Sequence, residues 1–361
     1  MTARFHTTVT ERGAFRDCRR RWHLESQLRL SPRDQVQWPL IFGEAVHSGL
    51  EAYYRHNRSL ARCLTAFTKA WEAEGEALKE LYRGFYDLGI GDEWQEHLDK
   101  GTAMLTNYNI FDKVHPFFDE ISEINIEERA FVDILDLERD RLPGLPLLSG
   151  RIDLVGYREG EDAPWIMDHK TSVTAPSVRA LDLDDQLTGY CYIYWRLTGI
   201  VPRGAIYNVL SKEPPTPPRV LKDGSLSRAK DQRTTFELYV QAIDEHGLDR
   251  EEYEEYLEFL AEKGWKQFFV REGVQRNEDE LRSFERRLMH EYEDMQRGLA
   301  NPGFLYPNPG QRTCGICSFI PLCQSIEEQG DWEYVRDTMY QVQEPRHSVP
   351  ARIASPKWKG V

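Results

Sequence analysis

Long apolar runs are absent from this sequence. No eighteen consecutive residues among the 361 are apolar, and a transmembrane helix needs about that many. The first residues, MTARFHTTVTERGAF, lack the apolar segment of a secretory signal peptide. We therefore expect no membrane span and no secretion, and we predict a cytoplasmic location.

Cysteine is scarce and unevenly spaced. Two of the six cysteines lie in apolar helical stretches and are expected in the core, whereas three others form C-x2-C-x5-C. In a cytosolic chain this spacing indicates a metal site rather than disulfides. A usual site has four ligands, so one more is needed. The six positions are Cys18, Cys63, Cys191, Cys314, Cys317 and Cys323, of which Cys63 and Cys191 are the predicted core pair.

Excess positive charge is also missing. The formal net charge is -14, which argues against a generally basic surface that binds polyanions. Local basic clusters remain, and each is either a phosphate-binding patch or ordinary solvated surface. One cluster holds Arg16, Arg19, Arg20 and Arg21, and the other holds Arg219, Lys222, Arg228, Lys230 and Arg233. No P-loop of the G-x4-G-K-[ST] type occurs, so we expect no motor activity.

Hydrophobic periodicity predicts helices first and strands afterwards. Helices are expected over 8–30, 43–56 and most of 60–118. Strands are expected over 123–135, 146–159, 164–172 and 204–212, with one helix between the last two. This order predicts a mixed sheet with a packed helix.

The C-terminal third is predicted to be mostly helical. A Pro-rich stretch from 214 is expected to be a loop or small hairpin, followed by a helix near 249–265. A longer helix over 277–303 opens with Asn277 and Glu280 in a capping-box arrangement. Its apolar stripe, from Leu281 to Leu299, is interpreted as core packing. Residues after about 341 are expected to form a loose tail.

The predicted strands carry the candidate chemistry. Asp168 and Lys170 are two residues apart and therefore share a strand face, whereas His169 points to the other face. Asp153 on the preceding strand reaches Asp168 if the hairpin register brings them level. Two carboxylates and carbonyl oxygens suit Mg²⁺, and a neighbouring lysine can position water or offset phosphate charge. The alternative is a charged face with a chance ion pair.

Further polar residues flank these strands. Gly150 precedes Asp153 in a G-x-x-D pattern, and Gln186 and Tyr190 lie four apart on one helix face. His47 is a polar residue on a mostly apolar helix, where a histidine is often only a satisfied core residue. Tyr192 and Tyr194 lie close enough to compete with Tyr190.

Taken in order, these motifs resemble the PD-(D/E)XK nuclease superfamily, and its RecB-like exonuclease branch in particular. The resemblance implies a restriction-endonuclease-like α/β core and hydrolysis of DNA phosphodiester bonds. It implies Mg²⁺ or Mn²⁺ ligated by His47, Asp153, Asp168 and the main-chain carbonyl of His169. Catalytic roles follow for Asp153, Asp168, Lys170, Gln186 and Tyr190, with Lys170 orienting water and Gln186 and Tyr190 positioning the strand.

Cys18 and the later cysteine triplet enclose these motifs. That arrangement resembles the iron–sulfur nucleases, which include CRISPR-associated RecB-like, AddB-like and phage exonucleases. The resemblance implies a [4Fe-4S] cluster on Cys18, Cys314, Cys317 and Cys323, with Arg19, Arg20 and Arg21 beside the DNA. Four thiolates would also suit zinc. A cluster would close most of the chain into one loop and staple its ends.

The overall prediction is a single PD-(D/E)XK nuclease domain over 1–335 with helical insertions, followed by a tail over 336–361. Within it we expect a helical part over 1–120, a nuclease core over 121–212, an insertion over 213–300 and a cysteine segment over 301–330. The expected function is a metal-dependent exonuclease acting on single strands or resected ends, with 5′ to 3′ polarity favoured, in recombination, repair or phage DNA processing. The alternatives are a non-catalytic DNA-end adaptor, and a subunit that trims DNA beside an integrase or recombinase partner in CRISPR adaptation.

Overall fold

The computed structural model describes residues 6–81, 89–121, 129–133, 147–172 and 181–343. The helices are α1 (Val9–Asp17), α2 (Arg19–Trp22), α3 (Trp38–Arg55), α4 (Leu60–Leu81), α5 (Ile90–Val114), α7 (Asp185–Thr198), α8 (Phe236–Glu245), α9 (Glu254–Lys263), α10 (Glu278–Ala300), α11 (Gln311–Cys314), α12 (Ile320–Glu327) and α13 (Trp332–Met339). The strands are β1 (His6–Thr8), β2 (Leu30–Pro32), β3 (Glu120–Ile121), β4 (Arg129–Asp133), β5 (Leu147–Arg151), β6 (Leu154–Tyr157), β7 (Trp165–Ser172), β8 (Gly204–Ser211), β9 (Phe269–Gln275) and β10 (Tyr340–Val342). Within the described part, no helix is both long and apolar enough to cross a membrane.

A five-stranded mixed sheet forms the centre of the molecule. Its strand order is β3-β6-β7-β8-β9, and only β7 and β8 run parallel. Parallel neighbours require a crossover, which α7 supplies. The predicted strands over 164–172 and 204–212 and the helix between them are thus confirmed. The predicted insertion over 213–300 also contributes to the sheet, because β9 pairs antiparallel with β8.

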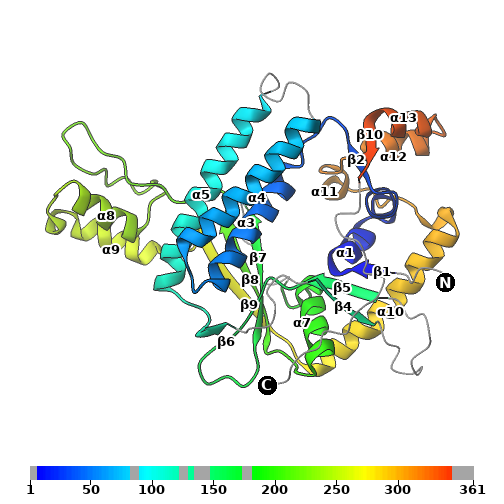
Figure 1. Cartoon of the computed structure of the whole chain (residues 1–361), viewed down its shortest axis with the longest axis horizontal. Helices are drawn as coiled ribbons and strands as arrows, with labels where there is room; N and C mark the ends of the chain where they lie inside the picture. The colour runs from blue at the N-terminus through cyan, green and yellow to red at the C-terminus, as the bar shows by residue number, and fades with distance from the viewer. Residues whose placement is uncertain (1–5, 82–88, 122–128, 134–146, 173–180, 344–361) are drawn as a thin grey trace.

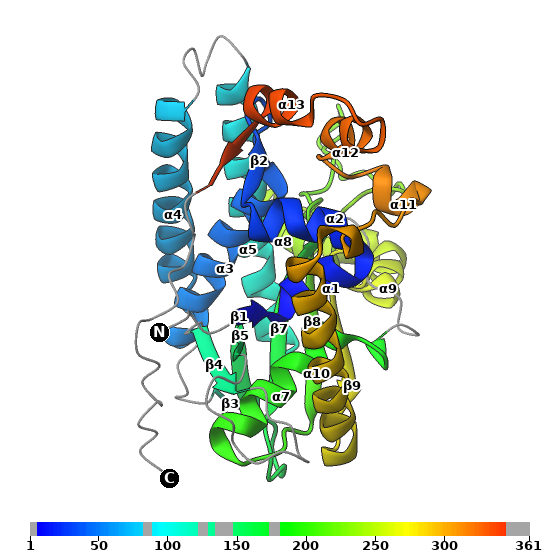
Figure 2. The ribbon, with the colours of Figure 1, turned by 90° about the vertical axis from the view of Figure 1, so that its right-hand side faces the viewer.

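Helices cover both faces of this sheet, as Figures 1 and 2 show. On one face, α3, α4 and α5 bury an aromatic-rich core around Trp71, Phe67 and Tyr108. On the other face, α7 and α10 bury a second core around Tyr192, Phe284 and Leu288. Coverage on both sides explains why β8 is buried along its whole length.

The predicted strand over 146–159 is two strands in different sheets. Strand β5 pairs with β1 and β4, whereas β6 pairs with β3 and β7. The break falls at Ile152 and Asp153, which have no regular secondary structure. The single-strand prediction was therefore wrong, since periodicity cannot show a chain that changes sheets. Of the predicted strand over 123–135, residues 129–133 form β4, and the others lie outside the described residues.

The predicted helix over 8–30 is interrupted at Cys18. This residue is extended, with φ -162° and ψ 112°, and it ends α1 and begins α2. Its sulfur accepts a hydrogen bond from the Arg21 N–H at 3.5 Å. A short π-helix over His23–Gln27 follows. The thiol is thereby turned out of the helical register.

Helices α8 and α9 form an arm that projects from the body (Figure 1). The arm has its own small core, which includes Leu226, Tyr239 and Tyr253. The Pro-rich stretch before it contains an antiparallel bridge between Val220 and Leu226, which matches the predicted small hairpin.

An N-terminal and a C-terminal segment of the chain pair in a separate two-stranded sheet. Strand β10 pairs antiparallel with β2, with Tyr340 opposite Pro32. The predicted tail over 336–361 is thus helix and strand as far as Val342, and residues 344–361 lie outside the described part. Helix α10 carries the predicted capping box at Asn277. Its apolar stripe is buried except at Tyr292, which is half-buried, and at Leu299, which is 38% exposed.

Candidate active site and cysteine pocket

Asp153 and Asp168 lie side by side at the centre of the sheet. Strands β6 and β7 pair with Leu154 opposite Met167, so the next step of the antiparallel register brings Asp153 level with Asp168. Both are buried, at 6% and 2% exposure. The predicted carboxylate pair is therefore formed, and it lies in the interior rather than on a solvated face.

Two donors from different elements hold Asp153. The Nδ1 atom of His47, from α3, lies 3.3 Å from one carboxylate oxygen, and the His169 main-chain N–H donates to the other at 2.7 Å. Burial by itself would raise the pKa of Asp153. The charge and hydrogen bond of His47, with the contribution of His169, outweigh burial and hold that pKa well below its ordinary value.

The pKa of Asp168 is shifted in the opposite direction to that of Asp153. Burial, reinforced by the negative charge of Asp153, raises the pKa of Asp168 to about 6, although Lys170 acts in the other direction. The Lys170 Nζ lies 2.7 Å from the carboxylate, and the lysine side chain is 36% exposed. Burial lowers the pKa of Lys170, but the Asp168 charge more than offsets burial and the net shift is upward. Environments that push paired carboxylate pKa values apart are typical of acid–base and metal sites.

The ring of His169 points to the other face of the sheet, as predicted. It stacks on Tyr54 with 5.8 Å between ring centroids and 6° between planes. Its Nδ1 lies 2.8 Å from the side-chain nitrogen of Asn208. Burial lowers the pKa of His169 to about 3, so the ring is neutral at physiological pH.

Gln186 and Tyr190 meet on α7. The Gln186 side-chain nitrogen donates to the Tyr190 hydroxyl at 3.0 Å, and the charges of Asp168 and Asp153 contribute to raising the pKa of Tyr190 after burial. Tyr192 instead donates to Glu285, on α10, at 2.7 Å. Tyr190 is therefore the tyrosine of this helix that pairs with Gln186.

Close packing against α7 explains why the G-x-x-D pattern has glycine at position 150. A Cβ on Gly150 would lie 2.8 Å from the Ile193 side chain and 3.1 Å from the Tyr190 ring. Helix α7 thus packs directly onto the β5 backbone. This close approach sets the distance of Tyr190 from the strand that leads to Asp153.

Sequence reasoning missed Tyr207 and Asp184. Tyr207 is opposite Asp168 in the β7–β8 register, and its hydroxyl lies 3.0 Å from Asp184 and 3.4 Å from Gln186. The Lys170 Nζ lies 5.4 Å from the Tyr207 ring centroid. The available signal was the polar pair Tyr207–Asn208 inside a strand that is otherwise apolar.

The donor set fits a hard divalent cation. Mg²⁺ needs only one or two protein carboxylates and keeps several waters, and the two buried aspartates provide these. Among the described residues, no group of three or more His, Cys, Asp or Glu side chains meets the geometry of a metal site. Instead, the side chains pair with each other: His47 contacts Asp153, and Lys170 contacts Asp168.

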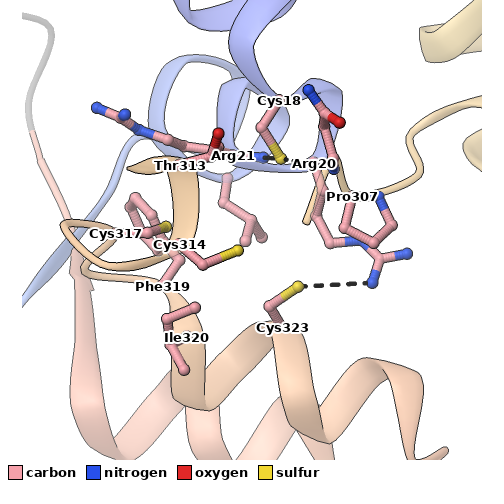
Figure 3. Close-up of a pocket in the computed structure, with 12 residues that line it drawn as sticks. Cys18, Arg20, Arg21, Pro307, Thr313, Cys314, Cys317, Phe319, Ile320 and Cys323 are labelled. Atoms are coloured by element: carbon pink, nitrogen blue, oxygen red, sulfur yellow. Dashed lines mark hydrogen bonds between the residues drawn. The ribbon is translucent and has the colours of Figure 1, made fainter. Parts of the chain in front are cut away.

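The four predicted cysteine ligands line one small pocket. Figure 3 shows the sulfurs of Cys18, Cys314, Cys317 and Cys323 directed toward a shared space between the N-terminal and C-terminal segments. The Asn308 N–H lies 3.5 Å from the Cys18 sulfur, like that of Arg21, and Leu24, Phe319 and Ile320 form apolar walls. The two other cysteines, Cys63 and Cys191, are buried in the helical cores as predicted.

Arg19, Arg20 and Arg21 each have a carboxylate partner. Arg19 pairs with Asp294 at 3.0 Å, Arg20 with Glu327 at 2.5 Å and Arg21 with Glu25 at 2.9 Å. Arg20 also lies 3.8 Å from the Cys323 sulfur. The pairs of Arg19 and Arg20 link α2 to α10 and α12, and Arg20 and Arg21 line the pocket. The predicted contact of the three arginines with DNA stays a prediction.

Comparison with known proteins gives a family match across most of the chain. The sequence model of the PD-(D/E)XK nuclease superfamily matches residues 6–324. The matched range begins before Cys18 and ends directly after Cys323. No curated protein sequence matches the chain. A solved structure described as "Crystal structure of SSO0001" is 12% identical, with a TM-score of 0.32, over 90% of this chain and 88% of that one.

Proposed function

The chain belongs to the PD-(D/E)XK nuclease superfamily, and from this premise we propose that it is a Mg²⁺- or Mn²⁺-dependent exonuclease acting on DNA ends. We propose single-strand or resection activity with 5′ to 3′ polarity, in recombination, repair or phage DNA processing. The observation that carries the hydrolase assignment is the buried carboxylate pair with Lys170 beside it.

The environment of each side chain indicates its proposed role. Asp153 is held ionised by His47 and the His169 N–H, and we assign it as an anionic ligand of the cation. Asp168, His47 and the main-chain carbonyl of His169 are the other proposed ligands. The cation, when bound, supplies Lewis-acid stabilisation and lowers the pKa of water.

Lys170 lies at the open side of the site. Its ammonium group can orient the attacking water or offset the charge that develops on the phosphate. Gln186, Tyr190 and Tyr207 form a hydrogen-bonded row from α7 to β8. We assign to this row the positioning of the DNA strand.

Cleavage of end-labelled single- and double-stranded DNA tests this function. Wild type is expected to shorten DNA stepwise with Mg²⁺ or Mn²⁺, and Asp168→Ala and Lys170→Ala are expected to be inactive. Asp231→Ala is a matched control, because Asp231 is 84% exposed on the projecting arm. Labels at the 5′ and 3′ ends report the polarity.

Full activity in Asp168→Ala and Lys170→Ala would contradict the assignment. A folded, metal-replete wild type that binds DNA ends without cleaving them would indicate a non-catalytic end-binding adaptor instead.

We also propose that the cysteine pocket holds a [4Fe-4S] cluster with a structural role. Supporting observations are the four converging thiols and the N–H groups near the Cys18 sulfur, since hydrogen bonds to sulfur tune such clusters. Four thiolates suit either a [4Fe-4S] cluster or a single zinc ion, and metal analysis distinguishes the two.

Iron and sulfide analysis of anaerobically purified protein tests the cluster. About four iron atoms per chain are expected, together with broad visible absorbance. Zinc in place of iron, or no metal at all in wild type, would contradict it.

A further inference from the structure

The ring of His169 has a partner that the proposed mechanism does not use. Only the main chain of His169 contacts Asp153, yet its imidazole makes a buried hydrogen bond to Asn208, the paired residue on β8. His169 is 2% exposed and Asn208 is fully buried. A polar pair buried this deeply needs an explanation.

Arg271 fixes the orientation of the Asn208 amide. The Arg271 Nε lies 3.1 Å from the Asn208 oxygen, and a guanidinium can only donate hydrogen bonds. The amide nitrogen therefore faces the other way, toward His169 Nδ1 at 2.8 Å and the Tyr108 hydroxyl at 2.9 Å. Since this nitrogen donates, His169 Nδ1 accepts, and the ring proton resides on Nε2.

A buried charge network holds Arg271 in place. Arg271 pairs with Asp112, and Arg58 reaches the same carboxylate at 3.1 Å. The side chains of Asp112 and Arg271 are 1% and 7% exposed. A buried ion pair seldom adds stability over an apolar equivalent, so its effect here is better sought in what it orients.

The same network reaches the helix that carries His47. The Tyr54 hydroxyl contacts the Tyr108 hydroxyl at 2.6 Å and Asp112 at 3.2 Å. Tyr54 follows His47 by seven residues on α3, so both lie on one face of that helix. Both rings contact His169, Tyr54 by stacking and His47 edge-on at 6.0 Å. The contacts of His169 thus set the spacing between α3 and β7.

We propose that Asn208, oriented by Arg271, is a positioning residue that fixes His169 as its Nε2–H tautomer and thereby holds the His169 main chain on Asp153. The inference rests on the proposed function, because Asp153 is the proposed metal ligand. Mutation of a residue that orients a metal ligand without touching the metal typically lowers metal affinity by roughly 10–100-fold.

The test uses Asn208→Asp, which is nearly isosteric and keeps an acceptor for Arg271. A carboxylate cannot donate to His169 Nδ1, so the ring must place a proton there. Nitrogen-15 spectra of histidine-labelled protein, assigned with His169→Phe, report the tautomer directly. Mn²⁺ binding by calorimetry without DNA is expected to weaken roughly tenfold, and kcat is expected to fall with the DNA KM unchanged.

Tyr53→Phe is the matched control. It removes one hydrogen bond to Asp112 at the far end of the network and leaves the Asn208–His169 contact intact. The tautomer and the Mn²⁺ affinity of this variant are expected to equal those of wild type.

The outcomes separate this inference from the proposed function. Wild type that binds Mn²⁺ with the His169 proton on Nδ1 overturns the positioning role alone, and so does a folded Asn208→Asp protein with unchanged Mn²⁺ affinity. Wild type that shows the Nε2–H tautomer but binds no Mn²⁺ overturns the proposed function and the positioning role with it. The wild-type spectrum needs no variant, so the inference is testable even if Asn208→Asp fails to fold.

Discussion

The carboxylate site and the cysteine pocket differ in how their side chains are satisfied. At the carboxylate site, Asp153 and Asp168 are almost fully buried, and each has a charged or main-chain partner. In the cysteine pocket, Cys314, Cys317 and Cys323 are only partly buried, and few hydrogen bonds reach the sulfurs.

The apolar cores around the two sites also differ in size. The carboxylates lie between two large apolar clusters, whereas a small cluster around Leu24, Phe319 and Leu322 supports the pocket. The first site is therefore built by the fold and expected to survive loss of a single side chain. The second region joins two ends of the chain, and we expect it to depend on what the thiols bind.

Removing the charge of Asp168 is expected to have the largest effect on activity. Asp168→Asn should lower cleavage by roughly 10²–10³-fold or more, because electrostatic stabilisation of the reacting phosphate is lost. The same change should stabilise the metal-free protein at pH 8. Burial raises the pKa of Asp168 to about 6, so ionisation costs folding free energy as the pH rises from the ordinary value through 6.

Thermal unfolding of wild type and Asp168→Asn at pH 4 and pH 8 measures this trade. A gain on the order of 1–3 kcal/mol is expected at pH 8. The difference is expected to vanish near pH 4, where the wild-type carboxyl is protonated. A variant less stable than wild type at pH 8 would show that the Lys170 pairing outweighs burial.

Replacing a pocket cysteine should lower stability, in contrast to the stabilisation expected for Asp168→Asn. Cys18→Ser is expected to abolish iron binding by the proposed cluster and loosen the contact between the N-terminal and C-terminal segments, lowering the unfolding midpoint by roughly 5–10 °C at 2–4 °C per kcal/mol. Limited proteolysis should then cleave first in the segment around α11 and α12. Cys63→Ala is the control, since Cys63 is buried in the helical core and its loss should leave the iron content unchanged. Equal iron content in Cys18→Ser and wild type would contradict the role of Cys18 as a ligand of the proposed cluster.

An added methyl group at Gly150 should disturb the carboxylate site through packing. Gly150→Ala places a Cβ 2.8 Å from Ile193, and such overpacking costs about 1–3 kcal/mol. Displacement of Tyr190 from Gln186 should also lower kcat. In contrast, a Cβ at Gly13 on α1 has open space, and Gly13→Ala should stabilise by about 0.5–1 kcal/mol. Differential scanning calorimetry and cleavage rates for both variants check the contrast.

The smallest expected effect concerns Arg21 beside the cysteine pocket. Its pair with Glu25 is a half-exposed helical contact, so Arg21→Gln should change stability by less than about 0.5 kcal/mol. If Arg21 contacts a phosphate, the slope of log affinity against log salt falls by about one unit. DNA binding by Asp168→Asn proteins with and without Arg21→Gln measures this slope. Arg250→Gln, on the projecting arm, should leave it unchanged.

Local sequence pattern predicted most of the elements that carry the site. Strand alternation placed Asp168 and Lys170 on one face and the His169 ring on the other, because side-chain direction in a strand depends only on residue parity. Helical spacing paired Gln186 with Tyr190, and the capping box located the start of α10. These features need no knowledge of distant residues.

Other features could not be read from local pattern. The change of sheet at Asp153 and the addition of β9 to the sheet depend on long-range pairing. The extended conformation of Cys18 interrupts a run whose periodicity is helical on both sides. The roles of Tyr207, Asn208 and Arg271 depend on strand order, which periodicity does not encode.

The sequence by itself determined which chemistry the protein carries: two aspartates and a lysine at strand spacing, a histidine on an early helix, and four thiols at the two ends. Only the tertiary structure decided how these groups are tuned. Burial acts to raise the pKa of both aspartates. His47 and His169 outweigh burial at Asp153 and lower its pKa, whereas burial and the charge of Asp153 raise that of Asp168, and these desolvation and Coulomb effects depend on distances that the linear chain does not fix.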